Sequence, residues 1–274
     1  MLDKIEQLFA EQIASWPLLT RGTDALKQVQ TRNVDLNGFT VWIRHLPHRI
    51  ASTTAAVDPA SVEKRPCFLC SANLPPEEKG LPFNAELTIY CNPFPILDRH
   101  MTIVHKDHRP QRIENQVENL FALAESMPGY FIIYNGPECG ASAPDHLHFQ
   151  ACSVGGVPIV DDVKKAVGRT IPDYGRQVWV VRNPNQLKEA IARWNDLSPR
   201  DPEPLLNLAV FRRDSGMVAT LFPRRKHRPA AYYTGEFTVS PATIDLCGVF
   251  VTPVEKDFQT ISGEDIRRIF QEVS

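Results

Sequence analysis

The sequence has 274 residues, of which 43% are hydrophobic and 23% charged, and its formal net charge is −2. This composition is typical of a globular protein with a large core, and it excludes a general electrostatic attraction to nucleic acid or anionic membranes. No apolar run approaches the roughly 20 residues that span a bilayer, and the N-terminal segment lacks the apolar stretch of a secretion signal. We therefore expect a cytoplasmic protein whose six cysteines are thiols or metal ligands.

The first half of the chain predicts short helices and strands. Residues 2–15 show the apolar spacing of an amphipathic helix, which ends before Pro17 because the residue preceding a proline disfavours helical backbone. The Ala-, Thr- and Pro-rich stretch 52–66 predicts a loop. A helix is predicted over 114–125, and strands are predicted at 40–44, 86–91, 99–105 and 130–134.

The second half begins near residue 160 and shows the same mixture. A hairpin is predicted to turn at Asp214-Ser215-Gly216, and a last helix starts at Ser262, whose hydroxyl is a typical N-cap. The basic run 224–228 is interpreted either as a solvated loop or as a phosphate clamp. The remaining predicted elements are a strand at 177–182, a helix at 185–195 and a strand at 246–252.

Two segments suggest an internal duplication. Residues 102–110 and 221–229 each predict a strand that ends in His-Arg-Pro, and their separation is too long for a solenoid repeat. We interpret the chain as two related halves of one fold, a catalytic half at 1–160 and a second, non-catalytic half at 161–274.

Cys67 and Cys70 form a Cys-x-x-Cys pair in the turn Pro-Cys-Phe-Leu-Cys. Such a pair aims two sulfurs at one point, as zinc knuckles do. A redox dithiol and two unrelated buried cysteines are the alternatives, and the pair alone does not decide between them.

The stretch 145–152 carries the strongest chemical signal of the chain. Strand alternation places His146, His148, Gln150 and Cys152 on one face and the apolar residues between them on the other. A neutral imidazole has a free ring nitrogen that attacks phosphorus or binds a metal, and a glutamine amide donates to phosphate oxygens. Two histidines on a strand are by themselves more often a packing feature.

The loop 135–144 runs straight into this stretch. Its small residues and glycines, Gly140 among them, let backbone amides approach a phosphate closely. A plain turn is the alternative. The place of the loop between two predicted strands, beside the histidines, favours the functional interpretation.

Together these motifs resemble a known family. Cys-Phe-Leu-Cys, Asp-His and a Gly-Ala-Ser loop ahead of His-x-His-x-Gln are similar to galactose-1-phosphate uridylyltransferase and related phosphorylases of the histidine-triad superfamily. The likeness reaches further toward the GDP-hexose phosphorylases, the GDP-L-galactose and GDP-glucose enzymes. It implies an α+β fold with a histidine-triad-like antiparallel sheet and flanking helices.

The resemblance also implies roles for the matching residues. His148 would attack the α-phosphorus of a nucleotide and hold the nucleotidyl group as a phosphoramidate, while Gln150 would donate to a non-bridging oxygen. Asn135 and Ser142 would lie along the α- and β-phosphates, with Gly140 in the same substrate-binding loop. Structural zinc, or iron with the same donors, would be bound by Cys67, Cys70, His108 and His146.

The expected activity is therefore transfer of a nucleotidyl group from a nucleoside diphosphate hexose, GDP-hexose foremost, to phosphate or a sugar phosphate. Glutamine at position 150 matches the family's transferases and phosphorylases, whereas its hydrolases have histidine there. A dinucleoside polyphosphate phosphorylase and a non-catalytic, zinc-stabilised nucleotide-binding protein are the alternatives. No nucleic-acid or membrane partner is expected, and homodimer formation through a strand edge stays open.

Overall fold

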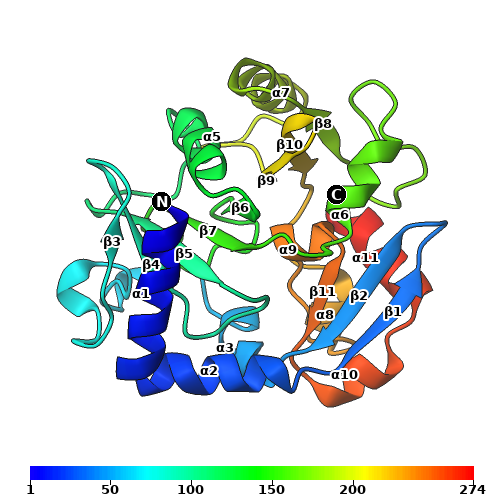
Figure 1. Cartoon of the computed structure of the whole chain (residues 1–274). Coiled ribbons are helices and arrows are strands. Elements are labelled where there is room, and N and C mark those ends of the chain that lie inside the picture. The colour runs from blue at the N-terminus through cyan, green and yellow to red at the C-terminus, as the bar shows by residue number, and fades with distance from the viewer.

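The computed structural model describes residues 1–274, which form a large and a small sheet with helices around them (Figure 1). The large sheet has eight strands, and all of its pairs are antiparallel. In spatial order the strands are β3 (Leu81–Pro82), β4 (Leu87–Cys91), β5 (Met101–His105), β7 (His148–Ser153), β6 (Tyr130–Asn135), β9 (Leu206–Arg213), β10 (Gly216–Pro223) and β8 (Trp179–Val181). This architecture confirms the expected α+β class with an antiparallel sheet.

The small sheet joins the two ends of the chain. It contains β1 (Thr31–Asp35), β2 (Thr40–His45) and β11 (Val249–Thr252), with β1 antiparallel and β11 parallel to β2. Figure 1 shows the two N-terminal strands in blue beside the orange C-terminal strand. Segments from opposite ends of the sequence therefore meet on one side of the molecule.

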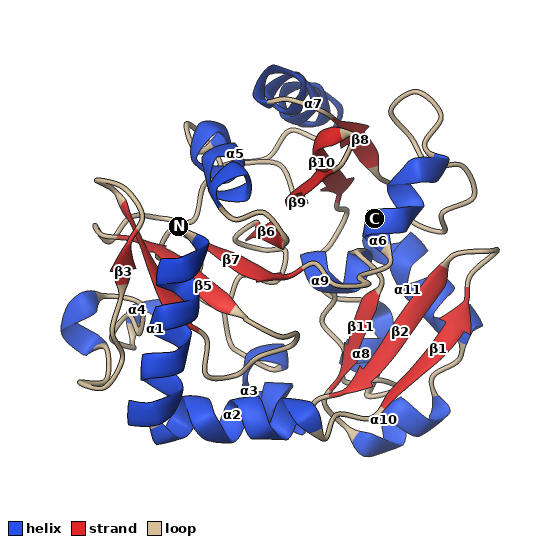
Figure 2. Cartoon of the chain, in the orientation of Figure 1, coloured by secondary structure: helices blue, strands red, loops and turns tan.

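Helices cover the sheets on several sides, as Figure 2 shows. Helix α5 contacts β6 and β9, α7 contacts β8 and β10, and α1 contacts β3 and β4. The helices are α1 (Leu2–Ser15), α2 (Pro17–Lys27), α3 (Ile50–Thr53), α4 (Pro59–Glu63), α5 (Val117–Ser126), α6 (Ile159–Asp162), α7 (Pro184–Leu197), α8 (Ala230–Thr234), α9 (Thr243–Leu246), α10 (Glu255–Thr260) and α11 (Gly263–Val273). None of them combines the length and the apolarity that crossing a bilayer requires.

The large sheet has one apolar core on each face. Strand alternation divides its side chains, so Ile132 packs in the core under α1, α5 and α7, while its neighbour Ile133 packs in the core shared with the small sheet, α9 and α11. Strand β7 follows the same rule, with Phe149 in the first core and Cys152 in the second. The face of β7 that carries His148 and Gln150 therefore looks toward the small sheet.

Most of the predicted elements are confirmed, with ends shifted by a few residues. Helix α11 begins after Ser262 in a capping box with Asp265, as its sequence indicates. The prediction of an uninterrupted loop at 52–66 is wrong, because Asp58 caps α4 by accepting from the Ser61 amide and Pro59 occupies its first turn. Helix α2, which starts at the proline that ends α1, was not among the predicted elements.

The interpretation of 1–160 and 161–274 as two related halves remains a prediction. Strands from both stretches belong to the same large sheet, where β6 and β9 form the junction between them. The repeated His-Arg-Pro segments follow β5 and β10 of this sheet.

Candidate functional site

Strand β7 is held between β5 and β6, so its backbone position is fixed on both sides. Gln150 lies opposite Thr102 of β5 and Ile133 of β6. The strand begins at His148 rather than at residue 145, which corrects the expected start. His146 precedes the strand in a turn, where its amide donates to the Ala143 carbonyl. Because of this turn, its ring does not lie on the same strand face as the ring of His148.

One nitrogen of the His148 ring is hydrogen-bonded within the chain, and the other is not. Nδ1 lies 2.8 Å from the His146 carbonyl oxygen, so Nδ1 carries the proton and donates it. Burial lowers the pKa of His148 to about 4, which makes the ring neutral at pH 7. Nε2 has no hydrogen-bond partner in the chain, so its lone pair is available to an electrophile.

Gln111, which was not among the predicted site residues, fixes the backbone next to this ring. Its Nε2 donates to the carbonyls of Asn135 and His148 at 2.9 and 3.0 Å, and its Oε1 accepts from the His148 amide at 2.8 Å. The side chain is 1% exposed. It therefore joins the end of β6 to the start of β7, where the two strands begin to separate.

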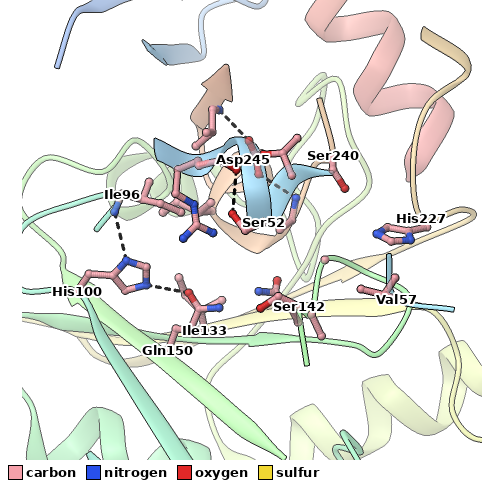
Figure 3. Close-up of a pocket in the computed structure, with 18 of the residues that line it drawn as sticks. Ser52, Val57, Ile96, His100, Ile133, Ser142, Gln150, His227, Ser240 and Asp245 are labelled. Carbon is pink, nitrogen blue, oxygen red and sulfur yellow. Dashed lines mark hydrogen bonds between the residues drawn. The ribbon is translucent and has the colours of Figure 1, made fainter. Parts of the chain in front are cut away.

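Gln150 is oriented by His100, a second residue that the sequence analysis missed (Figure 3). The Ile96 amide donates to His100 Nδ1 at 3.2 Å, so the ring proton is on Nε2, which lies 2.8 Å from Gln150 Oε1. Burial also lowers the pKa of His100 to about 3, which keeps it neutral. The Gln150 oxygen is thus occupied from behind, and its amide nitrogen is left for a ligand.

The predicted substrate-binding loop lies against the C-terminal part of the chain. Gly140 has φ +97°, and a Cβ there would meet the Ala242 Cβ at 2.6 Å, so only glycine allows this approach. Asn135 Oδ1 accepts from the Asn207 amide at 2.9 Å and from the Thr243 hydroxyl at 2.7 Å. Ser142 lies nearby, and the structure brings all three predicted residues to one cavity wall.

Two cavities meet at Gln150. The apolar cavity contains His148 in its wall, together with polar residues such as Arg65 and Glu78. Its aromatic and aliphatic side chains include Trp16, Leu18, Phe68, Leu69, Tyr90 and Phe94. The polar cavity is rich in hydroxyl, amide and guanidinium groups, and Figure 3 shows Gln150 and Ser142 facing Ser52 and Asp245 across it. The residues that line both cavities are Arg49, Ser52, Ser142 and Gln150.

The four predicted metal ligands lie together. One ligand atom from each of Cys67, Cys70, His108 and His146 lies within 4.8 Å of all the others. The Cys67 and Cys70 sulfurs are 3.3 and 3.6 Å from His146 Nδ1, and Cys70 is 3.2 Å from His108 Nδ1. Donors of a tetrahedral zinc lie about 3.3–3.8 Å apart. The three sulfur–nitrogen separations are close to this range, so the cluster could hold a metal ion after a small contraction.

The surroundings of this cluster also suit a metal. His146 Nε2 lies 2.7 Å from the His105 carbonyl, which places the ring proton on Nε2 and turns the Nδ1 lone pair toward the sulfurs. Asp145 approaches the exposed nitrogen of His108 at 3.9 Å and forms an ion pair with Arg65 at 2.9 Å. The two histidines of the motif therefore face different partners, His146 the cysteines and His148 the cavity.

The basic run 224–228 is not a uniform solvated loop. Arg224 is fully buried and donates to the carbonyls of Val273 and Pro241, which ties the chain end to the loop before α9. His227 and Arg228 line the polar cavity, and Arg225 is exposed. The run therefore contains a structural residue, Arg224, then two solvent-facing residues, Arg225 and Lys226, and then the two cavity-lining residues.

A known family model matches the first half of the chain. Residues 8–153 match a family model described as "Domain of unknown function (DUF4922)". A search of the curated proteins found no match.

Similar folds occur in solved structures of yeast Ap4A phosphorylase Apa2. The crystal structure of that enzyme has 14% identity and a TM-score of 0.64, and the match covers 94% of this chain and 96% of that one. Its complex with AMP has 13% identity, a TM-score of 0.64 and coverages of 98% and 96%. Its complex with Ap4A has 12% identity, a TM-score of 0.67 and coverages of 99% and 97%. The shared fold confirms the expected histidine-triad-like architecture.

Proposed function

We propose that this chain, which belongs to the DUF4922 family of unknown function, is a nucleotidyltransferase that acts through a covalent nucleotidyl–His148 intermediate. The observation that carries the proposal is the state of His148. Its Nδ1 proton is held by the His146 carbonyl, and its free Nε2 belongs to a ring that lines a cavity. A buried, neutral imidazole with a fixed tautomer is a competent nucleophile toward phosphorus.

In the first step, the Nε2 lone pair of His148 forms a bond to the α-phosphorus of a bound nucleotide. The bond from that phosphorus to the bridging oxygen breaks, and the leaving group takes the electron pair. The positive charge that develops on the ring is stabilised through Nδ1 by the His146 carbonyl. The Gln150 amide nitrogen, freed by His100, donates to a non-bridging oxygen of the same phosphorus.

In the second step, an oxygen of inorganic phosphate forms a bond to the phosphorus of the phosphoramidate. The bond from that phosphorus to Nε2 breaks, and its electron pair returns to the ring, which restores neutral His148. The product is a nucleoside diphosphate. Little covalent chemistry is left to the protein. Catalysis therefore depends on holding the phosphorus in line between His148 Nε2 and the oxygen that leaves in the first step or attacks in the second. Asn135, Ser142 and the Gly140 backbone belong to the wall on which the phosphates would lie.

We propose a dinucleoside polyphosphate as the substrate. Yeast Ap4A phosphorylase, whose fold this chain shares over nearly its full length, has been solved with AMP and with Ap4A. The two adjoining cavities also support a substrate with two arms, because a nucleoside in the apolar cavity would extend its phosphates past Gln150 into the polar one. The GDP-hexose expected from the sequence has no such support and remains the second candidate.

The proposed metal, zinc by its donor set, would have a structural role. Two thiolates and two imidazoles leave a tetrahedral ion with no open position, so it would supply no chemistry to the reaction. Its ligands would tie the turn at 67–70 to the segment after β5 and to the turn before β7. His148 would then stand two residues from a rigid anchor.

A substrate panel tests the proposal. Diadenosine tetraphosphate and GDP-, UDP- and ADP-hexoses are incubated with the purified chain, with and without phosphate, and nucleoside diphosphate is measured. We expect phosphate-dependent turnover of the dinucleotide and loss of at least about 10³-fold in His148→Ala. Turnover of a nucleoside diphosphate hexose, without turnover of the dinucleotide, would show that the substrate is a nucleotide sugar and not a dinucleoside polyphosphate. Absence of all turnover, with nucleotide affinity unchanged in His148→Ala, would contradict the proposed enzymatic activity and favour a nucleotide-binding protein.

A further inference from the structure

The polar cavity contains guanidinium groups that have no carboxylate partner. Arg228 donates through Nε to the Ser240 hydroxyl and through Nη2 to two backbone carbonyls of the 53–55 segment, and its Nη1 has no acceptor. Arg49 donates only through Nη1, to the Phe94 carbonyl at 3.1 Å. Neither residue takes part in an ion pair, although ion pairs are frequent elsewhere in the chain.

Only one acidic side chain lines this cavity, and both of its oxygens are occupied. Asp245 accepts from the Ala242 amide at 2.8 Å and from the Val251 amide at 2.9 Å. Behind the wall, Arg224 donates to neutral oxygen atoms alone. Two lining guanidinium groups against one carboxylate leave an excess of positive charge at the cavity, which favours an anion there.

The side-chain amides of Asn135 and Gln150 both present their nitrogen to the cavity, because their oxygens are hydrogen-bonded within the protein. Asn135 is 6% exposed, and its oxygen receives three donors from behind, namely the Asn207 amide and the hydroxyl and backbone amide of Thr243. Its own NH₂ group therefore faces the cavity and has no acceptor. The Gln150 amide nitrogen is presented in the same way, because His100 occupies its oxygen.

A wall of this kind discriminates between ligands. A phosphate group is surrounded by acceptor oxygens and matches unpaired N–H donors and guanidinium forks. A hexose needs acceptors for its hydroxyl protons and commonly an apolar surface for its ring. Here the amide oxygens and the carboxylate are already occupied from within the protein.

We propose that Arg49 and Arg228 form a second anion site, which binds a phosphate group beyond the one that His148 attacks. The ligand is a phosphate of inorganic origin or a distal phosphate of a polyphosphate chain. Its part in turnover rests on the proposed function, but binding itself does not. Arg49 enters from the segment before α3 and Arg228 from the segment before α8, so two segments that are far apart in the sequence form the site.

Calorimetric titration of the full chain with inorganic tripolyphosphate tests the site without any turnover. We expect saturable binding that Arg49→Gln and Arg228→Gln each weaken about 10- to 100-fold, as loss of a charge-assisted hydrogen bond predicts. Arg225→Gln removes the same charge from an exposed neighbour of Arg228, and we expect less than about a twofold change from it. Because Arg228 also holds the 53–55 segment, Arg49→Gln is the decisive variant if Arg228→Gln unfolds.

Competition identifies the source of the phosphate. With the anion site separate from the attacked phosphate, saturating AMP leaves tripolyphosphate binding in place. If ATP displaces tripolyphosphate and AMP does not, the site binds the distal phosphates of a nucleotide. If inorganic phosphate binds while ATP is also bound, the site binds the phosphate that accepts the nucleotidyl group. Failure of tripolyphosphate to bind, equal effects of Arg49→Gln and Arg225→Gln, or full displacement by AMP would overturn the proposal. A missing His148 adduct would instead overturn the proposed function and leave this site intact.

Discussion

His100 Nε2 lies 2.8 Å from Gln150 Oε1, and this hydrogen bond decides which end of the glutamine amide a ligand meets. The direction of the bond is fixed because the Ile96 amide already donates to the other ring nitrogen. Both residues are held on neighbouring parts of the sheet, with His100 just before β5 and Gln150 within β7. His100 is therefore a positioning residue for the proposed phosphate donor.

Replacement of His100 tests this relationship. In His100→Leu the glutamine amide is free to turn, so we expect the turnover number to fall about 10- to 100-fold with a smaller change in KM. In His100→Gln a side-chain N–H again reaches the Gln150 oxygen, and we expect most of the rate to return. Steady-state kinetics measure both effects, and equal rates for His100→Leu and the parent would contradict the assignment.

The burial of His100 also predicts a pH dependence of stability. Its folded pKa of about 3 lies below the unfolded value near 6.5, so between these pH values the unfolded chain binds more protons. Stability is therefore lost as the pH falls from 6.5 toward 3, and His100 alone contributes about 2–3 kcal/mol between pH 7 and 4.5. Urea unfolding at both pH values should show a smaller loss in His100→Gln; the same loss in both proteins would refute the prediction.

Gln111 should be important for both stability and activity. Its three buried hydrogen bonds hold the backbone of Asn135 and His148, and Gln111→Leu leaves those backbone groups unsatisfied. We expect a loss of about 2–4 kcal/mol in unfolding free energy. Gln116→Leu is the control, since that buried glutamine accepts a single side-chain hydrogen bond from Asn119. A loss no larger than that of the control would mean that other contacts fix the start of β7.

The cysteine–histidine cluster predicts one bound metal ion per chain. Elemental analysis of the purified protein should find this stoichiometry, and Cys70→Ser or His108→Ala should lower both metal content and thermal stability. Cys247→Ala is the control, because this buried cysteine lies in the apolar core outside the cluster. If the parent chain takes up no zinc or iron on titration, the four residues are only a hydrogen-bonded cluster.

The parts of the site that could be predicted from the sequence are those that depend on local patterns. Strand alternation separates His148 and Gln150 from Phe149, and the structure keeps that separation. The four metal-cluster residues came from resemblance, and they do lie together. The N-cap of α4 at Asp58 is also a local pattern, but it lies within a stretch of alanines and threonines whose composition favours a loop.

The supporting residues could not be read, because their roles depend on contacts between distant segments. Gln111 bonds to a strand start 37 positions later in the chain, and His100 bonds to a side chain 50 positions later. Arg49 and Arg228 lie far apart in the sequence and share one cavity. Neither arginine carries a local pattern that distinguishes a cavity wall from a solvated loop.

Intact-protein mass spectrometry after rapid mixing with diadenosine tetraphosphate, in the absence of phosphate, tests the central assignment most directly. We expect a mass increase of one nucleoside monophosphate that is acid-labile, maps to His148, disappears when phosphate is added and is absent from His148→Ala. An unmodified chain that nevertheless turns the substrate over, or an adduct on any other residue, would contradict it.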